Sequence, residues 1–149
     1  MLLLYILTVA CIGLLVGTEF SVSVFVNPVL GKLDDEAQAR TIRLFAVRLG
    51  TAMPFWYIAS LVLLLIETFV QRHEAGIPLL IAASAVWSAV IVLTLMFLVP
   101  INNRMMRLEG SFSEEERRNH KRWDRLHRWR VVALTACLLL LIVGSGSAR

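Results

Sequence analysis

The chain has few of the residues that stabilise small secreted domains or bind structural metals. Only two cysteines, Cys11 and Cys137, occur among 149 residues, and both lie in hydrophobic stretches. Two isolated cysteines do not indicate a disulfide framework, and we expect both to be small packing residues. No CxxC pair or His/Cys cluster has the spacing of zinc ligands. We therefore expect no metal site and no resident cofactor.

Charged residues are also scarce, at 17%, whereas hydrophobic residues make up 58% of the chain. Soluble domains contain roughly 45–50% apolar residues, and here the excess is concentrated in four blocks. Because unpaired backbone groups are too costly in lipid, each block should be a membrane-spanning helix. The sequence predicts an all-α integral membrane four-helix bundle in a single domain, residues 1–149, with spans at about 2–26, 51–70, 77–99 and 130–146.

The first block could also be read as a secretory signal peptide. A signal peptide needs a basic segment before a short hydrophobic region. Nothing basic precedes Leu2, and the hydrophobic run is longer than such a region. We therefore expect the first block to be retained as a helix.

Basic residues are placed unevenly along the chain. The net charge is +4, and 13 of the 15 lysines and arginines lie either between Lys32 and Arg48 or between Arg104 and Arg130. Both segments fall on the same side of a four-span protein, so the positive-inside rule puts them in the cytoplasm. We expect a multi-pass protein of the cell membrane, with both termini outside the cytoplasm. No basic surface interleaved with aromatics suggests nucleic acid as a partner.

Both of these segments carry helix signals. Acidic residues from Asp34 to Glu36 suit the start of a helix. Ile42, Phe45 and Leu49 then share one face, which predicts an interfacial amphipathic segment between spans one and two. Further along, Ser113 and Glu116 have the spacing of a capping box.

No proline or glycine interrupts residues 114–143. The fourth span should therefore have a long cytoplasmic extension, giving one helix about 45 Å long at about 1.5 Å per residue.

Glu19 is the most informative residue of the spans because it lies inside the first hydrophobic block. Ionisable residues within the membrane are candidates for function, although an acid near the interface can also serve structure alone. Asn27-Pro28 follows, and Pro28 is expected to end the first span. After the third span, Pro100 precedes Asn102 and Asn103, which form either a polar pocket floor or a kinked exit from the membrane.

A second group of polar residues precedes the fourth span. Trp123, His127 and Arg130 have the spacing i, i+4, i+7 and share a helix face, with His120 near the same face. This pattern is typical of an aromatic and basic collar at the membrane surface. Histidine adds the capacity to act as a base, donor or ligand. Asp124 and Arg128 should form a surface ion pair.

The predicted topology brings these polar residues to one level. Glu19, Asn102, Asn103, His127 and Arg130 all lie near the cytoplasmic face of the expected bundle. Cavities between helices are a usual place for sites in bundles. We expect a Glu19–Arg130 pair, which would neutralise both charges, beside a small cavity.

At these residues the chain resembles the anthrone oxygenase-like family of small four-helix membrane proteins, most of unknown function. The features that carry the resemblance span nearly the whole chain. They are Gly13 and Gly17, Phe25-x-x-Pro28-x-Leu30, Val99-Pro100-Ile101-Asn102 and Trp123-x-x-x-His127-x-x-Arg130.

The resemblance implies a chemistry, since characterised fungal members oxidise anthrones to anthraquinones without a recognised cofactor. By that analogy His127 or Glu19 would be the catalytic base. Asn102, Asn103 and Arg130 would hold the resulting enolate, with Trp123 also at the substrate site. The carbanion would then react directly with dioxygen.

Two classes of function remain open. One is an oxygenase or related redox enzyme that acts on a lipophilic anthrone-like or quinone-like substrate. The other is a non-catalytic membrane accessory or small-ligand-binding protein, as a homo-oligomer or with a partner membrane protein. A transporter or channel is a weaker alternative, because no span carries a polar stripe along its length.

Overall fold

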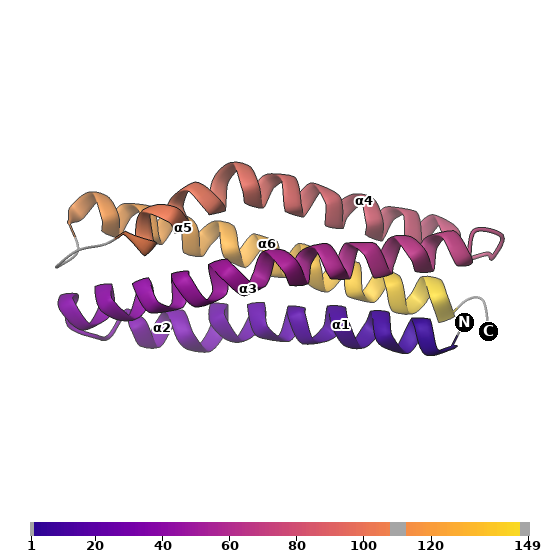
Figure 1. The fold of residues 1–149 in the computed structure, drawn as a ribbon, viewed down its shortest axis with the longest axis horizontal. Coiled ribbons are helices and arrows are strands. Elements are labelled where there is room, and N and C mark those ends of the chain that lie inside the picture. Colours follow the sequence, from indigo (N-terminus) through magenta and orange to yellow (C-terminus); the bar gives the residue numbers. More distant parts are fainter. Residues whose placement is uncertain (1, 108–112, 147–149) are drawn as a thin grey trace.

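The computed structural model describes residues 2–107 and 113–146, which form four long helical rods connected in antiparallel order (Figure 1). Within these residues there is no strand. The first rod comprises α1 (Leu2–Ser21), the π-helical turn η1 (Val22–Val26) and α2 (Asn27–Leu30), and the second is α3 (Asp35–Val70). The third comprises α4 (Ile77–Leu93), the π-helical turn η2 (Thr94–Leu98) and α5 (Val99–Met106), and the fourth is α6 (Glu114–Gly146).

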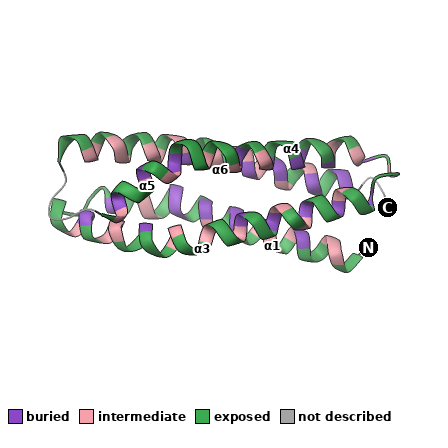
Figure 2. Cartoon of the chain, turned by 45° about the horizontal axis from the view of Figure 1, so that its top comes forward, coloured by how far each residue is buried: buried purple, intermediate pink, exposed green. Residues whose placement is uncertain are grey.

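All four rods are long and apolar enough to cross a membrane. Large apolar side chains also face outward along them, with Phe55 78% exposed, Phe69 67% and Leu14 66%. Figure 2 shows that exposed positions cover the outer surface of the rods, while buried positions face the axis of the bundle. Soluble proteins rarely expose so much contiguous apolar surface. The prediction of a four-helix membrane bundle is confirmed, and the chain is a multi-pass membrane protein.

The main core lies in the half of the bundle that contains the chain termini. Leu15, Leu64, Leu80 and Leu134 are completely buried there, one from each rod. At the end of the bundle where α4 begins, α4 and α6 approach so closely that a Cβ added to Gly76 would lie 1.8 Å from the Gly144 carbonyl oxygen. Only glycine fits at that crossing.

The first helix does not end at Asn27-Pro28, as the sequence predicts, but continues to Leu30. A proline inside an α-helix lacks an N–H donor and its ring clashes with the carbonyl four residues earlier. Here the backbone widens into η1 just before the proline, and the Asn27 N–H donates to the carbonyl of Val22 five residues back. Pro28 then occupies the first turn of α2, where a missing donor is tolerated.

The same arrangement recurs in the third rod. The π turn η2 ends two residues before Pro100, and the Val99 N–H donates to the Thr94 carbonyl. The helix continues through Asn102 and Asn103 as far as Met106. The residues after the third span are therefore helical.

The helix starts in the connecting segments are confirmed. The Asp34 carboxylate caps α3 by accepting a hydrogen bond from the Ala37 N–H at 2.9 Å. The Ser113 hydroxyl accepts from the Glu116 N–H, and the Glu116 carboxylate accepts in return from the Ser113 N–H. This is the reciprocal capping box that the spacing predicts.

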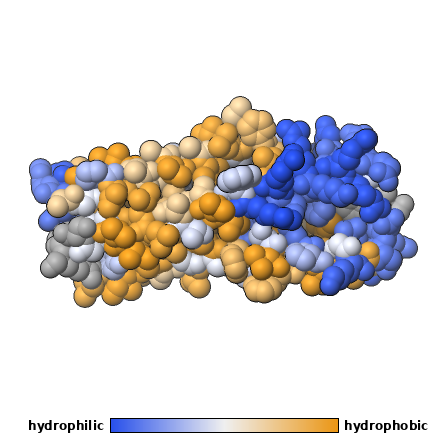
Figure 3. Space-filling model, turned by 180° about the vertical axis from the view of Figure 1, so that it is seen from behind, coloured by the Kyte–Doolittle hydropathy of each residue, from blue (hydrophilic) through white to orange (hydrophobic). Residues whose placement is uncertain are grey.

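The predicted amphipathic segment is the first half of α3, and it runs into span two without a break. Its Ile42 and Ala46 are buried in a second core with Leu30, Ile101 and Met105. This end of the molecule is strongly hydrophilic on its surface, as Figure 3 shows, and it lies opposite the two termini in Figure 1. The basic connecting segments therefore share one end of the bundle.

Candidate functional site

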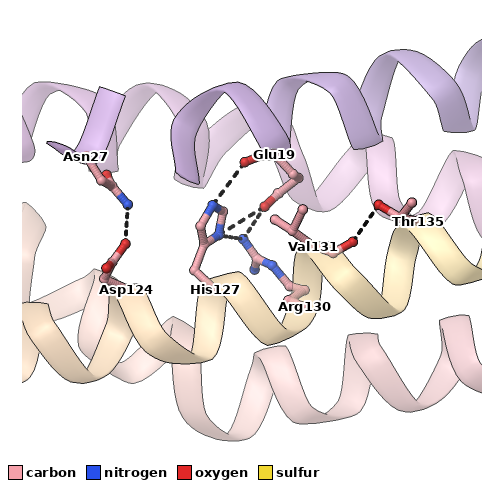
Figure 4. Close-up of polar contacts among 7 residues, drawn as sticks. All are labelled: Glu19, Asn27, Asp124, His127, Arg130, Val131 and Thr135. Carbon is pink, nitrogen blue, oxygen red and sulfur yellow. Dashed lines mark hydrogen bonds and ion pairs between the residues drawn. The ribbon is translucent and has the colours of Figure 1, made fainter. Parts of the chain in front are cut away.

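Three ionisable side chains meet inside the bundle where α1 and α6 lie side by side (Figure 4). The Arg130 Nη2 atom lies 2.6 Å from the Glu19 Oε2 atom, and the His127 Nδ1 atom lies 3.1 Å from the same oxygen. Arg130 Nη2 also lies 2.9 Å from His127 Nδ1. The expected Glu19–Arg130 pair is therefore present, with His127 as a third member.

The hydrogen bonds determine the tautomer of His127. Its Nε2 atom lies 3.1 Å from the backbone carbonyl of Glu19, which can only accept, so Nε2 carries the proton. In the neutral ring, Nδ1 is then an acceptor and takes a hydrogen bond from Arg130. Arg130 thus donates to both Glu19 and His127, and the short distance between Nδ1 and Oε2 follows from this shared donor.

The cluster is almost fully removed from solvent. The side chains of Glu19 and His127 are 3% and 2% exposed, and that of Arg130 is 11% exposed. An isolated charge at such a position is costly, whereas a hydrogen-bonded pair offsets much of that cost. The pair joins the first helix to the last, which are far apart in the sequence.

Tyr57 of α3 is the fourth member of the group. It is one of two tyrosines in the chain, and no sequence motif identifies it as a site residue. Its ring lies under the Arg130 guanidinium, 5.5 Å from centroid to Cζ, a distance at which cation–π attraction operates. Its hydroxyl interacts electrostatically with Glu19 and Arg130, but it forms no hydrogen bond of ordinary geometry with any described residue.

A cavity of about 400 Å³ lies against this cluster. Its walls come from all four rods and are mainly apolar, with Val22, Met53, Ile91 and Leu98 among the lining residues. The polar lining includes Glu19, Tyr57, His127 and Arg130. A mostly apolar cavity with a few convergent polar groups is the usual form of a small-molecule site, and about 300–1,000 Å³ is the usual size.

The other residues proposed from the sequence also line this cavity. Asn102, Asn103, His120 and Trp123 all contribute to its wall. The Asn102 amide donates to the Ala46 carbonyl at 3.4 Å, which ties α5 to α3. Both asparagines therefore line the cavity, and their role towards a ligand remains a prediction.

Aromatic rings on α6 stack along the same wall. The Trp123 ring lies parallel to the His127 ring with centroids 4.7 Å apart, and it also stacks with the ring of His120 at 6.3 Å. Stacking of this kind fixes the orientation of His127. It also presents the flat Trp123 ring among the apolar walls.

The expected ion pair between Asp124 and Arg128 is present. Asp124 has a second partner that the sequence does not reveal, because it accepts a hydrogen bond from the Asn27 amide at 2.8 Å (Figure 4). This contact joins α2 to α6 one turn beyond the cluster. Asn27 is therefore an inter-helix contact as well as the residue before a proline.

Among residues 2–107 and 113–146, no three His, Cys, Asp or Glu side chains are grouped closely enough to hold a metal ion. The two cysteines are unbridged. Cys11 lies 3.5 Å from the Ser60 hydroxyl, and the Cys137 thiol donates to the Ala83 carbonyl.

A family model described as anthrone oxygenase matches residues 42–140. The chain belongs to the anthrone oxygenase family. The matched segment contains His127, Arg130, Asn102 and Tyr57, whereas Glu19 lies before it. Comparisons with curated proteins and with solved structures gave no match.

The buried pair predicts a strong energetic coupling. Glu19→Gln or Arg130→Gln alone leaves one charge buried without its partner, which should lower the free energy of unfolding by about 3 kcal/mol or more. The double variant removes both charges and should recover a large part of that loss. Thermal unfolding of the four proteins in detergent measures this coupling as a double-mutant cycle.

The exposed pair of Arg104 and Glu115 provides the control, since both side chains are more than two-thirds exposed. Glu115→Gln should leave the unfolding temperature nearly unchanged. Additive losses in the Glu19 and Arg130 cycle would contradict the buried pair.

Proposed function

We propose that the protein is a cofactor-independent oxygenase that converts a lipophilic anthrone-like substrate to the corresponding quinone. The observation that carries the proposal is a carboxylate held at the wall of a largely apolar cavity within the membrane bundle of an anthrone oxygenase family member. An anthrone is a planar, apolar carbon acid. It therefore suits both the apolar walls and the carboxylate.

In the proposed reaction Glu19 removes the acidic proton from the methylene carbon of the substrate, giving an aromatic enolate. The enolate transfers one electron to dioxygen, and the resulting radical pair combines to a carbon-bound peroxide. The proton held by Glu19 returns to the peroxide, and loss of water from the hydroperoxide leaves the second carbonyl. Anthrone and dioxygen thus give anthraquinone and water.

Glu19 is a better candidate for the base than His127. Both ring nitrogens of His127 already have partners, namely the Glu19 carbonyl and Arg130. In this arrangement His127 is a positioning residue, which holds Arg130 and the first helix. Arg130 stabilises the carboxylate and lies close enough to the cavity to offset negative charge on the enolate.

The same contacts also support a second candidate, a non-catalytic protein that binds a lipophilic aromatic molecule for a partner. Arg130 donates to both the Glu19 carboxylate and His127 Nδ1, and a cluster satisfied by its own members can serve stability alone. Turnover separates the two functions, because a binding protein would bind the aromatic molecule without consuming oxygen.

We further propose that the basic end of the bundle faces the cytoplasm of the cell membrane and both termini face outward. The support is the placement of 13 of the 15 lysines and arginines in the segments at that end. The cavity would then lie in the cytoplasmic half of the membrane. A periplasmic-type reporter fused to the C-terminus should be active, and activity of a cytoplasmic reporter there would refute the orientation.

The oxygenase proposal predicts oxygen uptake by purified protein in lipid nanodiscs supplied with anthrone. Dioxygen and anthrone should disappear in equal amounts and anthraquinone should form, well above the spontaneous rate with empty nanodiscs. The Glu19→Gln/Arg130→Gln variant lacks the base but keeps the charge balance of the interior, so it should fall to the spontaneous rate.

Asp124→Asn is the matched control, because Asp124 accepts hydrogen bonds outside the cavity wall and should leave the rate nearly unchanged. Wild-type protein that binds anthrone yet takes up no oxygen would favour the binding function instead.

A further inference from the structure

Buried polar atoms without a hydrogen bond are unusual in native proteins, and each calls for an explanation. Five side-chain atoms of the described residues are of this kind, and three belong to residues that line the cavity. These three are the Tyr57 hydroxyl, the Thr94 hydroxyl and Arg130 Nε. Arg130 is otherwise engaged with Glu19. The Tyr57 hydroxyl lies against the same carboxylate but makes no hydrogen bond of ordinary geometry. The Thr94 hydroxyl has no hydrogen-bond partner among the described residues.

Thr94 differs from every other threonine in the chain. A threonine in a helix commonly donates its hydroxyl to the carbonyl four residues earlier, and the structure shows this bond at six of the seven threonines. They are Thr8, Thr18, Thr41, Thr51, Thr68 and Thr135. Thr94 begins the π turn η2, and its hydroxyl has no such bond.

The helix register places Thr94 and Tyr57 on two adjacent rods of the cavity wall. The Trp87 indole donates to the Tyr57 carbonyl at 3.2 Å, and Asn102 donates to Ala46, so α3 runs antiparallel to the third rod between these two contacts. Thr94 lies seven residues after Trp87, which puts it on the same helix face two turns along. The Tyr57 side chain leans back along α3 in that direction.

We infer that the hydroxyls of Tyr57 and Thr94 bind oxygen atoms of the ligand, so that the cavity takes an oxygenated aromatic molecule in preference to a hydrocarbon or a lipid acyl chain. A hydrocarbon in the cavity would leave both hydroxyls unsatisfied, which is costly in an apolar site. A ligand with carbonyl or phenolic oxygens satisfies them. The inference deepens the proposed function by naming the residues that select the substrate class.

The assignment adds two residues to the site that the sequence pattern does not mark. Tyr57 is 6% exposed and adjoins both Glu19 and Arg130, so an oxygen bound by its hydroxyl lies beside the proposed base. Thr94 supplies a second hydroxyl, from the third rod. Neither residue needs to move a proton for this role, which is recognition of oxygen.

The test compares the binding of two rigid tricyclic probes that differ in oxygen content, anthraquinone and anthracene. Binding to protein in nanodiscs is measured by quenching of tryptophan fluorescence, with empty nanodiscs correcting for partition into lipid. Wild-type protein should prefer anthraquinone. Tyr57→Phe and Thr94→Val each remove one hydroxyl and should weaken anthraquinone binding about three- to tenfold, with anthracene binding unchanged.

Two variants of matched chemistry serve as controls. Thr18 lines the same cavity but its hydroxyl already donates to Leu14, so Thr18→Val should not change the preference. Tyr5 lies outside the cavity lining, and Tyr5→Phe should behave in the same way. Equal binding of both probes by wild type, binding of neither, or a preference that is undiminished in Tyr57→Phe and in Thr94→Val would overturn the inference.

This measurement requires no turnover. A protein that shows the preference but takes up no oxygen keeps the inference and loses the oxygenase proposal. A protein that takes up oxygen with anthrone but binds anthraquinone and anthracene equally keeps the oxygenase proposal and loses the inference.

Discussion

The ion pair between Glu19 and Arg130 is the constraint on which the rest of the structure depends. It lies inside a bundle whose outer surface is apolar, where neither charge can be solvated by water. Each charged side chain therefore needs the other as its partner, and the resulting ion pair holds the first helix against the last. His127 strengthens this connection because its Nε2–H donates to the Glu19 carbonyl while Nδ1 accepts from Arg130. The polar cluster is thus also the contact that packs α1 against α6.

The cavity beside this pair owes its shape to two departures from regular helix. Each π turn precedes a proline by two residues, and both turns contribute to the cavity wall. A π turn inserts an extra residue into the helix, so that side chains around it change direction. Thr94 begins η2, and its hydroxyl makes no bond of the kind that the other threonines make to the carbonyl four residues earlier. The turn that accommodates Pro100 therefore also carries one polar residue of the cavity wall, Thr94.

Much of this was predictable from the sequence, for definite physical reasons. The bilayer requires long apolar helices, so the four spans could be located. The capping residues Asp34 and Ser113 indicated where two of the helices begin. Opposite charges at one depth also predicted that Glu19 would meet Arg130. The π turns have no comparable signature, so Pro28 was wrongly expected to end its helix. Tyr57, Thr94 and the Asn27–Asp124 contact depend on inter-helix register and rotamer, which a single sequence does not specify.

The proposed function requires that the cavity beside Glu19 and Arg130 bind a planar aromatic molecule. Photolabelling with anthraquinone tests it most directly, because near-ultraviolet light makes the quinone abstract hydrogen from nearby C–H bonds and couple to them. Peptide mass spectrometry should find saturable labelling at the cavity residues Met53, Ile91 and Leu98. Labelling confined to lipid-facing residues of the other half, such as Phe69, Ile81 and Leu139, and unsaturated at high probe concentration, would contradict the account.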